Sequence, residues 1–183
     1  MEYEFDLATP ADEPAIRRLL VNNPVPGRIT VTYLREPNYF LGCGTMGHFW
    51  QVVVARHRPT GQLAGVMCRA TRPLFINGQV EEVGYLSQLR IDGQFRGRWL
   101  VSQGFPYLRR LFEDGRVNGS IATIIEGSDE AAGILVEHPR RHFARFREMG
   151  RLWVMALVLR KPWFGTPPTP GPYRLERGTE ATL

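Results

Sequence analysis

The stretch from Val83 to Phe112 constrains the fold more than any other part of this sequence. Its first half, Val83 to Ile91, alternates bulky apolar residues with small or polar ones, which is the period of a β-strand. A turn at Asp92-Gly93 separates this strand from a basic loop that runs from Gln94 to Trp99. Beyond the loop, apolar residues recur at helical spacing, namely Leu100, Val101, Phe105, Leu108, Leu111 and Phe112. The segment therefore predicts a strand, a loop with a central glycine and a helix in direct succession.

A strand, a loop and a helix start in this order form a common anion-binding unit. The first N–H groups of the helix and the positive end of its dipole point at whatever lies before it. Arg96 and Arg98 add positive charge that suits a phosphate or pyrophosphate. Gly97 lets a ligand approach the backbone closely. A surface turn with two solvated arginines would have the same local sequence, so the loop alone leaves both interpretations open.

Two neighbouring motifs are more specific when they are taken together. Leu89-Arg90-Ile91, followed by Gln94-Phe95-Arg96-Gly97-Arg98, resembles the acyl-CoA signature of the GNAT N-acetyltransferase superfamily. In that signature a strand ends in an apolar-x-apolar triplet and the motif Gln/Arg-x-x-Gly-x-Gly/Ala begins a helix. Gln94 and Gly97 match this motif, whereas Trp99 stands where the family usually has glycine or alanine. The resemblance spans roughly Tyr3 to Arg160.

The resemblance implies a fold, a cosubstrate and a set of binding residues. The fold would be α/β, with a mixed central sheet flanked by helices. The cosubstrate would be acetyl-CoA or another acyl-CoA, and no metal would be needed. The predicted cofactor-binding residues are Leu89, Arg90, Ile91, Gln94, Phe95, Arg96, Gly97, Arg98, Trp99 and Leu100.

The chemistry that the resemblance implies is acyl transfer by direct attack. An amine of an unidentified acceptor would attack the thioester carbonyl, and a backbone N–H near Leu89 to Ile91 would hold the developing oxyanion. The pantetheine arm would lie between the strand Val83–Ile91 and the next predicted strand, Gly119–Glu126. The acceptor pocket would be built partly by residues 22–40.

The residues that would transfer protons depart from the family pattern. The usual tyrosine proton donor corresponds to Phe146, and phenylalanine has no proton to give. The asparagine that often faces CoA early in the last helix is replaced by Ser128 or Asp129. These departures favour an alternative function as well, namely a catalytically silent domain that binds CoA or acts as a scaffold within a larger two-domain GNAT protein.

Two side chains of the predicted central strand are candidates for the catalytic base. Glu82 lies at the start of the strand, and the period of two places Tyr85 on the same face as Ser87 and Leu89. A sheet tyrosine with a packed ring and a hydrated hydroxyl would have the same pattern. An ordered chain of water molecules is another candidate base. We predict Tyr85 and Glu82 as the catalytic residues.

The remaining segments predict one domain with alternating strands and helices. A strand at Tyr3–Leu7 leads into a helix over Ala11–Val21 that Thr9 can cap. Asn77-Gly78 is a strong hairpin signal, and Ile29–Leu34 is compatible with either strand or helix. Further predicted elements are a flexible turn at Leu41–Gly47, strands at Phe49–Ala55, Gln62–Thr71 and Leu152–Leu159, and helices from Ser128 or Asp129 through Leu135 and over Phe143–Met149.

Composition shifts near the end of the chain suggest three regions. Residues 1–161 form the predicted GNAT-like acyl-CoA-binding domain, and residues 162–172 form a linker rich in proline and glycine. Residues 173–183 are a tail in which Tyr173 to Ala181 echoes Tyr3 to Ala11. Either this tail is the first strand of a second GNAT-like domain, or the match is due to chance. A second domain or a second copy of the chain is therefore a candidate partner.

Charge and cysteine usage narrow the function classes further. The net charge is +5 with a pI near 9.7, but the basic residues are spread along the chain instead of forming one stripe, which argues against nucleic acid. No apolar run approaches the roughly 18 residues that a membrane span needs. The N-terminus lacks the pattern of a signal peptide. The two cysteines and four histidines show no metal-ligand spacing, and the cysteines are expected to stay reduced. These features predict a cytoplasmic protein without a membrane partner.

Overall fold

The structure of the chain, a computed structural model, describes residues 2–26, 30–97, 99–137 and 145–154. The chain divides into two compact units, residues 1–148 and residues 149–183. The described residues of the second unit, 149–154, are exposed and have no regular secondary structure. The predicted strand Leu152–Leu159 is therefore wrong for residues 152–154, and its remainder lies outside the described residues. The predicted linker and tail, residues 162–183, also lie outside them.

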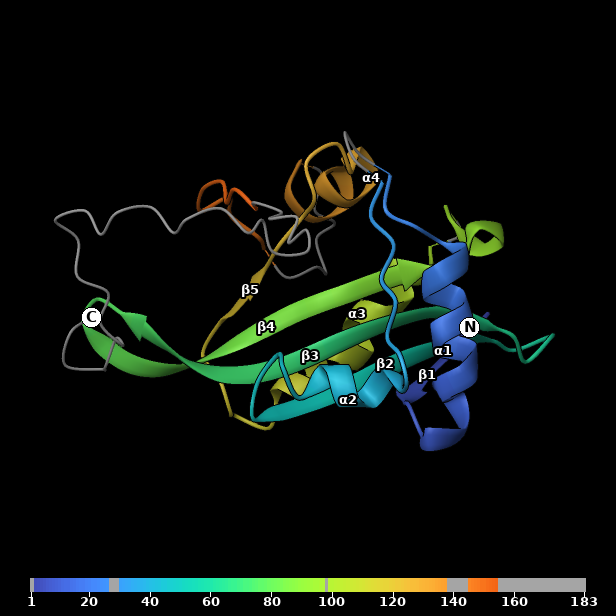
Figure 1. Ribbon diagram of the computed structural model, residues 1–183, viewed down its shortest axis with the longest axis horizontal. Coiled ribbons are helices and arrows are strands. Elements are labelled where there is room, and N and C mark those ends of the chain that lie inside the picture. The colour runs from blue at the N-terminus through green and yellow to red at the C-terminus, as the bar shows by residue number, and fades with distance from the viewer. Residues whose placement is uncertain (1, 27–29, 98, 138–144, 155–183) are drawn as a thin grey trace, which may run out of the picture. The chain divides into compact units, whose positions relative to one another are not determined.

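The first unit is built on a mixed five-stranded sheet in the order β1-β2-β3-β4-β5 (Figure 1). Neighbouring strands are antiparallel, except that β5 runs parallel to β4. This arrangement confirms the predicted α/β class with a mixed sheet, although β5 is shorter than the strand predicted over Gly119–Glu126. The strands are β1 (Tyr3–Leu7), β2 (Phe49–His57), β3 (Leu63–Ile76), β4 (Gln79–Ile91) and β5 (Ser120–Ala122).

The hairpin of β3 and β4 extends past the residues that were predicted to form it. The predicted turn at Asn77-Gly78 is confirmed, with φ of 51° and 81° at its two residues, as a type I′ hairpin turn requires. Both strands continue to this turn, so β4 begins at Gln79 instead of Val83. Phe75 and Val80 pair across this arm and are both exposed. A strand with neither face buried carries no apolar alternation, which explains why the prediction stopped short.

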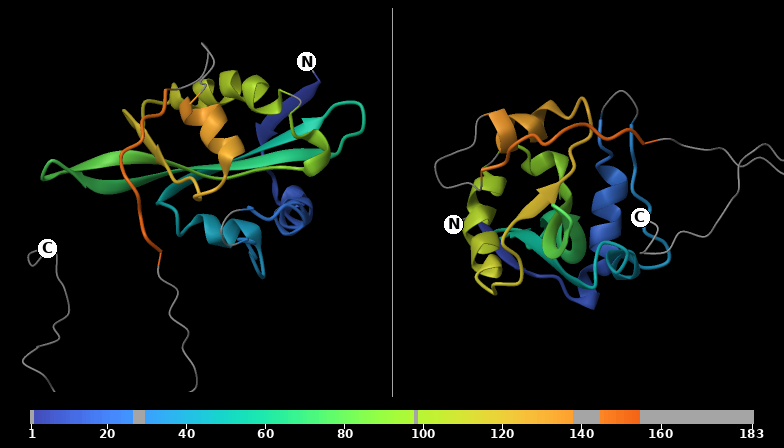
Figure 2. Two further views of the ribbon diagram at one scale, coloured as in Figure 1. Left: turned by 90° about the horizontal axis from the view of Figure 1, so that it is seen from above. Right: turned by 90° about the vertical axis from the view of Figure 1, so that its left-hand side faces the viewer.

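Helices cover both faces of the sheet (Figure 2). The helices α1 (Glu13–Asn22) and α2 (Tyr39–Cys43) lie on one face, and α3 (Leu100–Phe112) lies on the other. A 3₁₀ turn at Pro10–Asp12 begins α1, where the Asp12 carboxylate accepts hydrogen bonds from the backbone N–H and the hydroxyl of Thr9. The later helix α4 (Asp129–Ala132) continues as a π-helical turn over Gly133–Glu137. Residues 145–149 of the predicted helix Phe143–Met149 have no regular structure, and 143–144 lie outside the described residues.

The helix α2 replaces the first part of the flexible turn predicted at Leu41–Gly47. Asn38 caps this helix, because its side-chain oxygen accepts a hydrogen bond from the backbone N–H of Phe40 at 2.9 Å. The Glu13 carboxylate of α1 accepts a second bond from the backbone N–H of Tyr39, also at 2.9 Å. Tyr39 and Cys43 are fully buried. Tertiary contacts thus stabilise a short helix in a glycine-rich segment whose own helix propensity is low.

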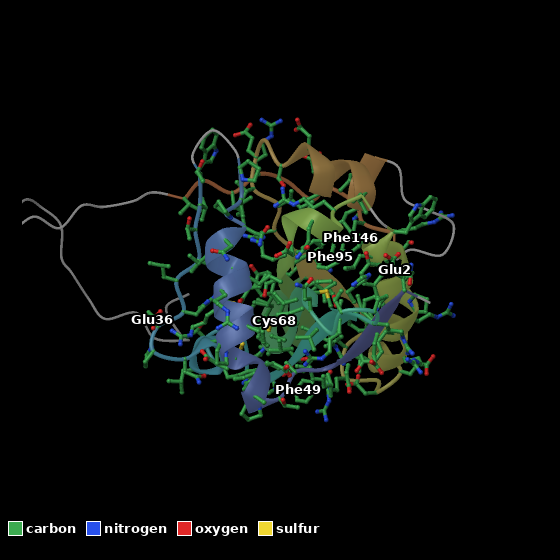
Figure 3. The ribbon with its side chains drawn as sticks, turned by 90° about the vertical axis from the view of Figure 1, so that its right-hand side faces the viewer. Glu2, Glu36, Phe49, Cys68, Phe95 and Phe146 are labelled. Atoms are coloured by element: carbon green, nitrogen blue, oxygen red, sulfur yellow. The ribbon has the colours of Figure 1, made fainter. Side chains whose placement is uncertain are left out.

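Alternating residues of each strand divide the interior into two clusters. Val52 and Val54 of β2 face α1 and α2, whereas Ala55 faces α3. Phe95 and Cys68 lie in the interior and Glu36 at the periphery (Figure 3). The cluster beneath α1 and α2 consists of Ile16, Leu19, Leu20, Tyr39, Cys43, Val52, Val54, Val66 and Cys68. The cluster beneath α3 consists of Tyr3, Ala55, Ala64, Phe95 and Leu100.

A buried arginine ties the sheet to the end of α3. Arg69 of β3 is completely inaccessible to solvent. Its guanidinium donates hydrogen bonds to the Gln51 side chain at 2.8 Å, to the Leu111 carbonyl at 2.6 Å and to the Asp114 carboxylate at 2.8 Å. It also lies 4.5 Å from the centre of the Phe112 ring.

Among the described residues, no helix has the length and apolar character needed to cross a membrane.

Candidate functional site

The strands β4 and β5 pair briefly and then separate, as Figure 1 shows. Their pairing covers Gly84 with Ser120, Tyr85 with Ile121 and Leu86 with Ala122. Gly84 permits this close approach, because a side chain there would meet the Ser120 hydroxyl. Beyond this point β4 continues to Ile91 with no described strand on that side. A cavity of about 510 Å³ lies at the separation, lined by both strands, by α3 and α4 and by the segment after α1.

A β-bulge at Gln88 changes the direction of the side chains along β4. Ser87 pairs with Cys68 and Arg90 pairs with Val66, so Gln88 and Leu89 together face one residue of β3, Met67. Gln88 adopts a left-handed conformation with φ of 59°. Cys68 and Val66 belong to the cluster beneath α1, so Ser87 and Arg90 face α1 as well. Leu89 and Ile91 then face α3. The prediction that Leu89 shares a face with Tyr85 is therefore wrong, because it assumed unbroken alternation.

The loop before α3 contains a short helical turn and a glycine in a left-handed conformation. Asp92 caps a 3₁₀ turn at Gly93–Phe95, since its side-chain oxygen accepts a hydrogen bond from the backbone N–H of Gln94. Gly97 has φ of 71°, a left-handed conformation that favours glycine. Trp99 has φ of 62° at the N-cap of α3, where the family pattern has glycine or alanine.

The structure brings part of the predicted site together. The predicted residues that line the cavity are Tyr85, Leu89, Arg90, Ile91, Arg96 and Leu100. Those outside its lining are Glu82, Gln94, Phe95, Gly97 and Trp99. Arg98 lies outside the described residues. Phe146, which stands at the position of the family's usual proton donor, also lines the cavity.

Several of the residues outside the cavity lining have other contacts. Phe95 is buried in the core, where its ring packs edge-on against that of Tyr3. Glu82 lies on the hairpin arm, 3.5 Å from His48. The Gln94 side chain is 3.5 Å from that of Gln62.

Tyr85 is the predicted catalytic residue that the cavity contains. It is partly exposed, and its hydroxyl lies 3.0 Å from the hydroxyl of Thr123, which follows β5. This hydrogen bond joins the two strands near the point where they separate. A hydroxyl pair at this position can relay a proton between the cavity and solvent.

Gln88 is a cavity residue that was not predicted. Both polar atoms of its side-chain amide are buried and make no hydrogen bond to any described residue. Buried amides are normally paired, so the Gln88 amide is unusual among the described residues. Its sequence context gave no signal, because the bulge that turns it into the cavity depends on pairing with β3.

The charge of the cavity lining is mostly positive. Among the described lining residues, the charged ones are Arg35, Arg90, Arg96 and Asp129. Two of these guanidiniums lie near the Tyr33 ring, with that of Arg90 at 5.2 Å and that of Arg35 at 6.0 Å from its centre. Burial lowers the pKa of Arg90, and the nearby charge of Arg96 lowers it further. Arginine nevertheless remains charged at neutral pH. No group of His, Cys, Asp or Glu residues in the described part of the chain could hold a metal ion.

Comparison with known proteins shows which solved structures this chain resembles. No protein-family model and no curated protein matches the sequence. Solved structures do match. AAC(6')-Iy in complex with a bisubstrate analogue, CoA-S-monomethyl-acetylneamine, has a TM-score of 0.60 at 14% identity, over 87% of this chain and 100% of its own. Ribosomal-protein-alanine N-acetyltransferase from Brucella melitensis has a TM-score of 0.56 at 13% identity, over 85% of this chain and 99% of its own. An acetyltransferase from Trypanosoma brucei has a TM-score of 0.54 at 18% identity, over 83% of this chain and 99% of its own.

These likenesses define the class of fold. Each likeness covers more than 80% of this chain and nearly the whole of the acetyltransferase chain. The chain has the GNAT acyltransferase fold.

Proposed function

We propose that the protein is an N-acyltransferase that moves an acetyl or other acyl group from CoA to an amine. The observation that carries this proposal is the cavity at the separation of β4 and β5, which reaches the loop before α3. A cosubstrate with an apolar arm and a pyrophosphate suits that combination of an apolar cavity and a basic helix start. The bisubstrate analogue bound by AAC(6')-Iy contains CoA, which supports the same assignment.

The binding half of this proposal assigns a role to each part of the site. The pantetheine arm would hydrogen-bond to the backbone of Ser87 to Ile91, along the edge of β4 that no described strand covers. The pyrophosphate would lie at the start of α3, near Gly97 and Arg96. A backbone N–H beside the bulge would stabilise the oxyanion of the tetrahedral intermediate.

The chemical half rests on Tyr85. The acceptor amine loses a proton, attacks the thioester carbonyl and expels the CoA thiolate, which is protonated in turn. Tyr85 and Thr123 form a hydroxyl pair through which such a proton can pass. Glu82, the other predicted candidate, does not line the cavity, so nothing in the geometry supports a catalytic role for it.

Replacing Tyr85 with phenylalanine is expected to lower kcat about tenfold to a hundredfold, because the ring is kept and only the hydroxyl is lost. The affinity for acetyl-CoA should stay unchanged. Steady-state kinetics measures both quantities. Tyr107→Phe is the matched control, since Tyr107 lies on α3 and does not line the cavity. Equal rates for the Tyr85 variant and wild type would remove Tyr85 from the mechanism.

The cosubstrate is tested by thermal unfolding with and without 1 mM acetyl-CoA. A ligand that binds only the folded state raises the melting temperature, and at about 100 times its Kd it adds about 2.7 kcal/mol of stability. We expect a clear rise with acetyl-CoA and none with acetate at the same concentration. An unchanged melting temperature would contradict the proposal.

A second candidate function is a silent domain that binds CoA without turnover. The specific observation in its favour is Phe146, which lines the cavity where the family has a proton donor. The described lining residues also include no histidine, and Asp129 is their one carboxylate. Release of free CoA thiol distinguishes the two functions, because an enzyme releases it only when an acceptor amine is added and a silent domain releases none.

A further inference from the structure

We infer that the acceptor amine carries an anionic group, a carboxylate or phosphate, which Arg90 and Arg35 bind at the α1 side of the cavity. This inference rests on the proposed function and specifies its substrate class. Its motivation is that the cavity lining holds three arginines and one carboxylate among the described residues.

The arginines of the cavity differ from several other arginines of the chain in their partners. Carboxylates pair with Arg17, Arg56 and Arg69 elsewhere in the structure. No described carboxylate lies within ion-pair distance of Arg35, Arg90 or Arg96. Arg90 donates one hydrogen bond, to the Leu89 carbonyl at 2.6 Å. A guanidinium has five N–H donors, so most of those on Arg90 are open to a ligand.

Two of these arginines converge from different elements. Arg90 faces α1 because the bulge at Gln88 turns it to that side. Arg35 comes from the segment after α1, and its Nη1 lies 3.5 Å from the Gly42 carbonyl of α2. The Nε of Arg35 is buried and has no hydrogen-bond partner in the described structure. Both guanidiniums lie close to the same Tyr33 ring, that of Arg90 at 5.2 Å and that of Arg35 at 6.0 Å from its centre.

The burial of Arg90 supports a ligand of opposite charge. A half-buried guanidinium without a counter-ion has lost part of its hydration. A carboxylate or phosphate would replace that hydration with short, charge-assisted bonds. Neighbouring apolar lining residues, including Val25, Met46 and Val66, suit the body of the same ligand. The ligand class is therefore an amine with an apolar body and one anionic group.

The position of these arginines favours the acceptor over CoA. Leu89 and Ile91 turn toward α3, where the proposed pyrophosphate site begins, whereas Arg90 turns to the opposite face. Arg35 belongs to the segment after α1 and not to the loop that leads into α3. An anion on the acyl group of the thioester is the other source of the same chemistry, and the experiment separates the two.

The experiment compares amines with and without an anionic group. The panel pairs L-leucine with L-leucinamide, L-phenylalanine with L-phenylalaninamide, and phosphoethanolamine with ethanolamine. Thiol release with acetyl-CoA is measured for each, and the melting temperature is measured in saturating CoA. We expect the anionic member of at least one pair to give the larger value in both measurements, with a rate advantage of roughly tenfold or more.

Substitutions show which residues cause the preference for an anionic amine. Arg90→Gln and Arg35→Gln should each remove the preference by raising KM for the anionic amine. In Arg35→Gln, which changes no residue of the proposed CoA site, the shift produced by acetyl-CoA should stay at its wild-type size. Arg72→Gln is the matched control, because Arg72 is exposed on β3 and does not line the cavity. Its preference should equal that of wild type.

Three outcomes would overturn the inference. In the first, the wild type releases thiol no faster, and melts at no higher temperature, with the anionic amine of any pair than with its neutral partner. The second is a preference that both cavity variants retain. The third is a preference that depends on Arg90 but appears between succinyl-CoA and butyryl-CoA instead, which would assign the anion to the acyl group. Failure of the proposed function is distinguishable, because it appears as the absence of any acetyl-CoA shift.

Discussion

Replacing Arg69 with methionine is expected to lower the free energy of unfolding by about 3 to 5 kcal/mol, the usual effect of removing one partner of a buried ion pair. The substitution keeps much of the apolar volume and removes all three hydrogen bonds of the guanidinium. The Leu111 carbonyl, the Gln51 side chain and the Asp114 carboxylate would each lose the hydrogen bond that Arg69 donates. Chemical denaturation followed by circular dichroism measures the loss.

Arg116→Met is the matched control for Arg69→Met. Arg116 pairs with the same Asp114 carboxylate at 3.2 Å and lies over the Phe49 ring, but its side chain is 51% exposed. Surface pairs of this kind contribute at most about 1 kcal/mol. Similar losses for the two variants would contradict the view that burial makes Arg69 important.

The same pair makes stability depend on pH. The hydrogen bond from Arg69 is the largest cause that holds the pKa of Asp114 below its usual value. A carboxyl with a lowered folded pKa stabilises the fold above its unfolded pKa of about 3.9. That contribution disappears as the pH falls from about 4 through the folded pKa. In Arg69→Met this part of the acid dependence should shrink.

Replacing Gly97 with leucine is expected to weaken acetyl-CoA binding by at least about 30-fold, because a side chain would stand where the pyrophosphate approaches the backbone. The fold should persist, since no described atom lies within 4 Å of a Cβ built at this position. The φ of 71° adds local strain of roughly 1 to 2 kcal/mol. Isothermal titration calorimetry measures the affinity directly.

Gly115→Leu provides the control for that strain. Gly115 has φ of 68° and equally open surroundings, but it lies in the turn after α3. Its variant should lose similar stability and keep its affinity for acetyl-CoA. If the Gly97 variant bound as tightly as the Gly115 variant, the pyrophosphate assignment of this loop would be wrong.

The fold was largely predictable because its signals are local. Apolar periodicity located β1, β2 and α3, and Asn77-Gly78 located the hairpin turn. Where tertiary contacts decide the structure, the predictions failed. The short helix α2 depends on Glu13 in another helix, and the outer part of the β3–β4 arm has no buried face to give it a pattern.

Part of the candidate site was predictable from the sequence. The predicted residues from Tyr85 to Ile91 line the cavity, whereas Arg96 is the one described residue between Gln94 and Trp99 that does so. The role of Gly97 in binding stays a prediction. Arg35, Tyr33 and Gln88 were missed, because they reach the cavity through a segment without regular structure and through a bulge. Neither feature has a sequence pattern of its own. Phe95 belongs to the signature, but it packs in the core.

The bulge at Gln88 also affects how the ligand preference of such a protein can evolve. A single extra residue decides which side chains of the last part of β4 face α1 and which face α3. Loss of that one codon would exchange Arg90 with its neighbours across the sheet in one event, whereas no single substitution could do so. Differences in ligand preference among proteins of this fold can therefore arise by insertion and deletion within a strand, without substitution of any other side chain of the site.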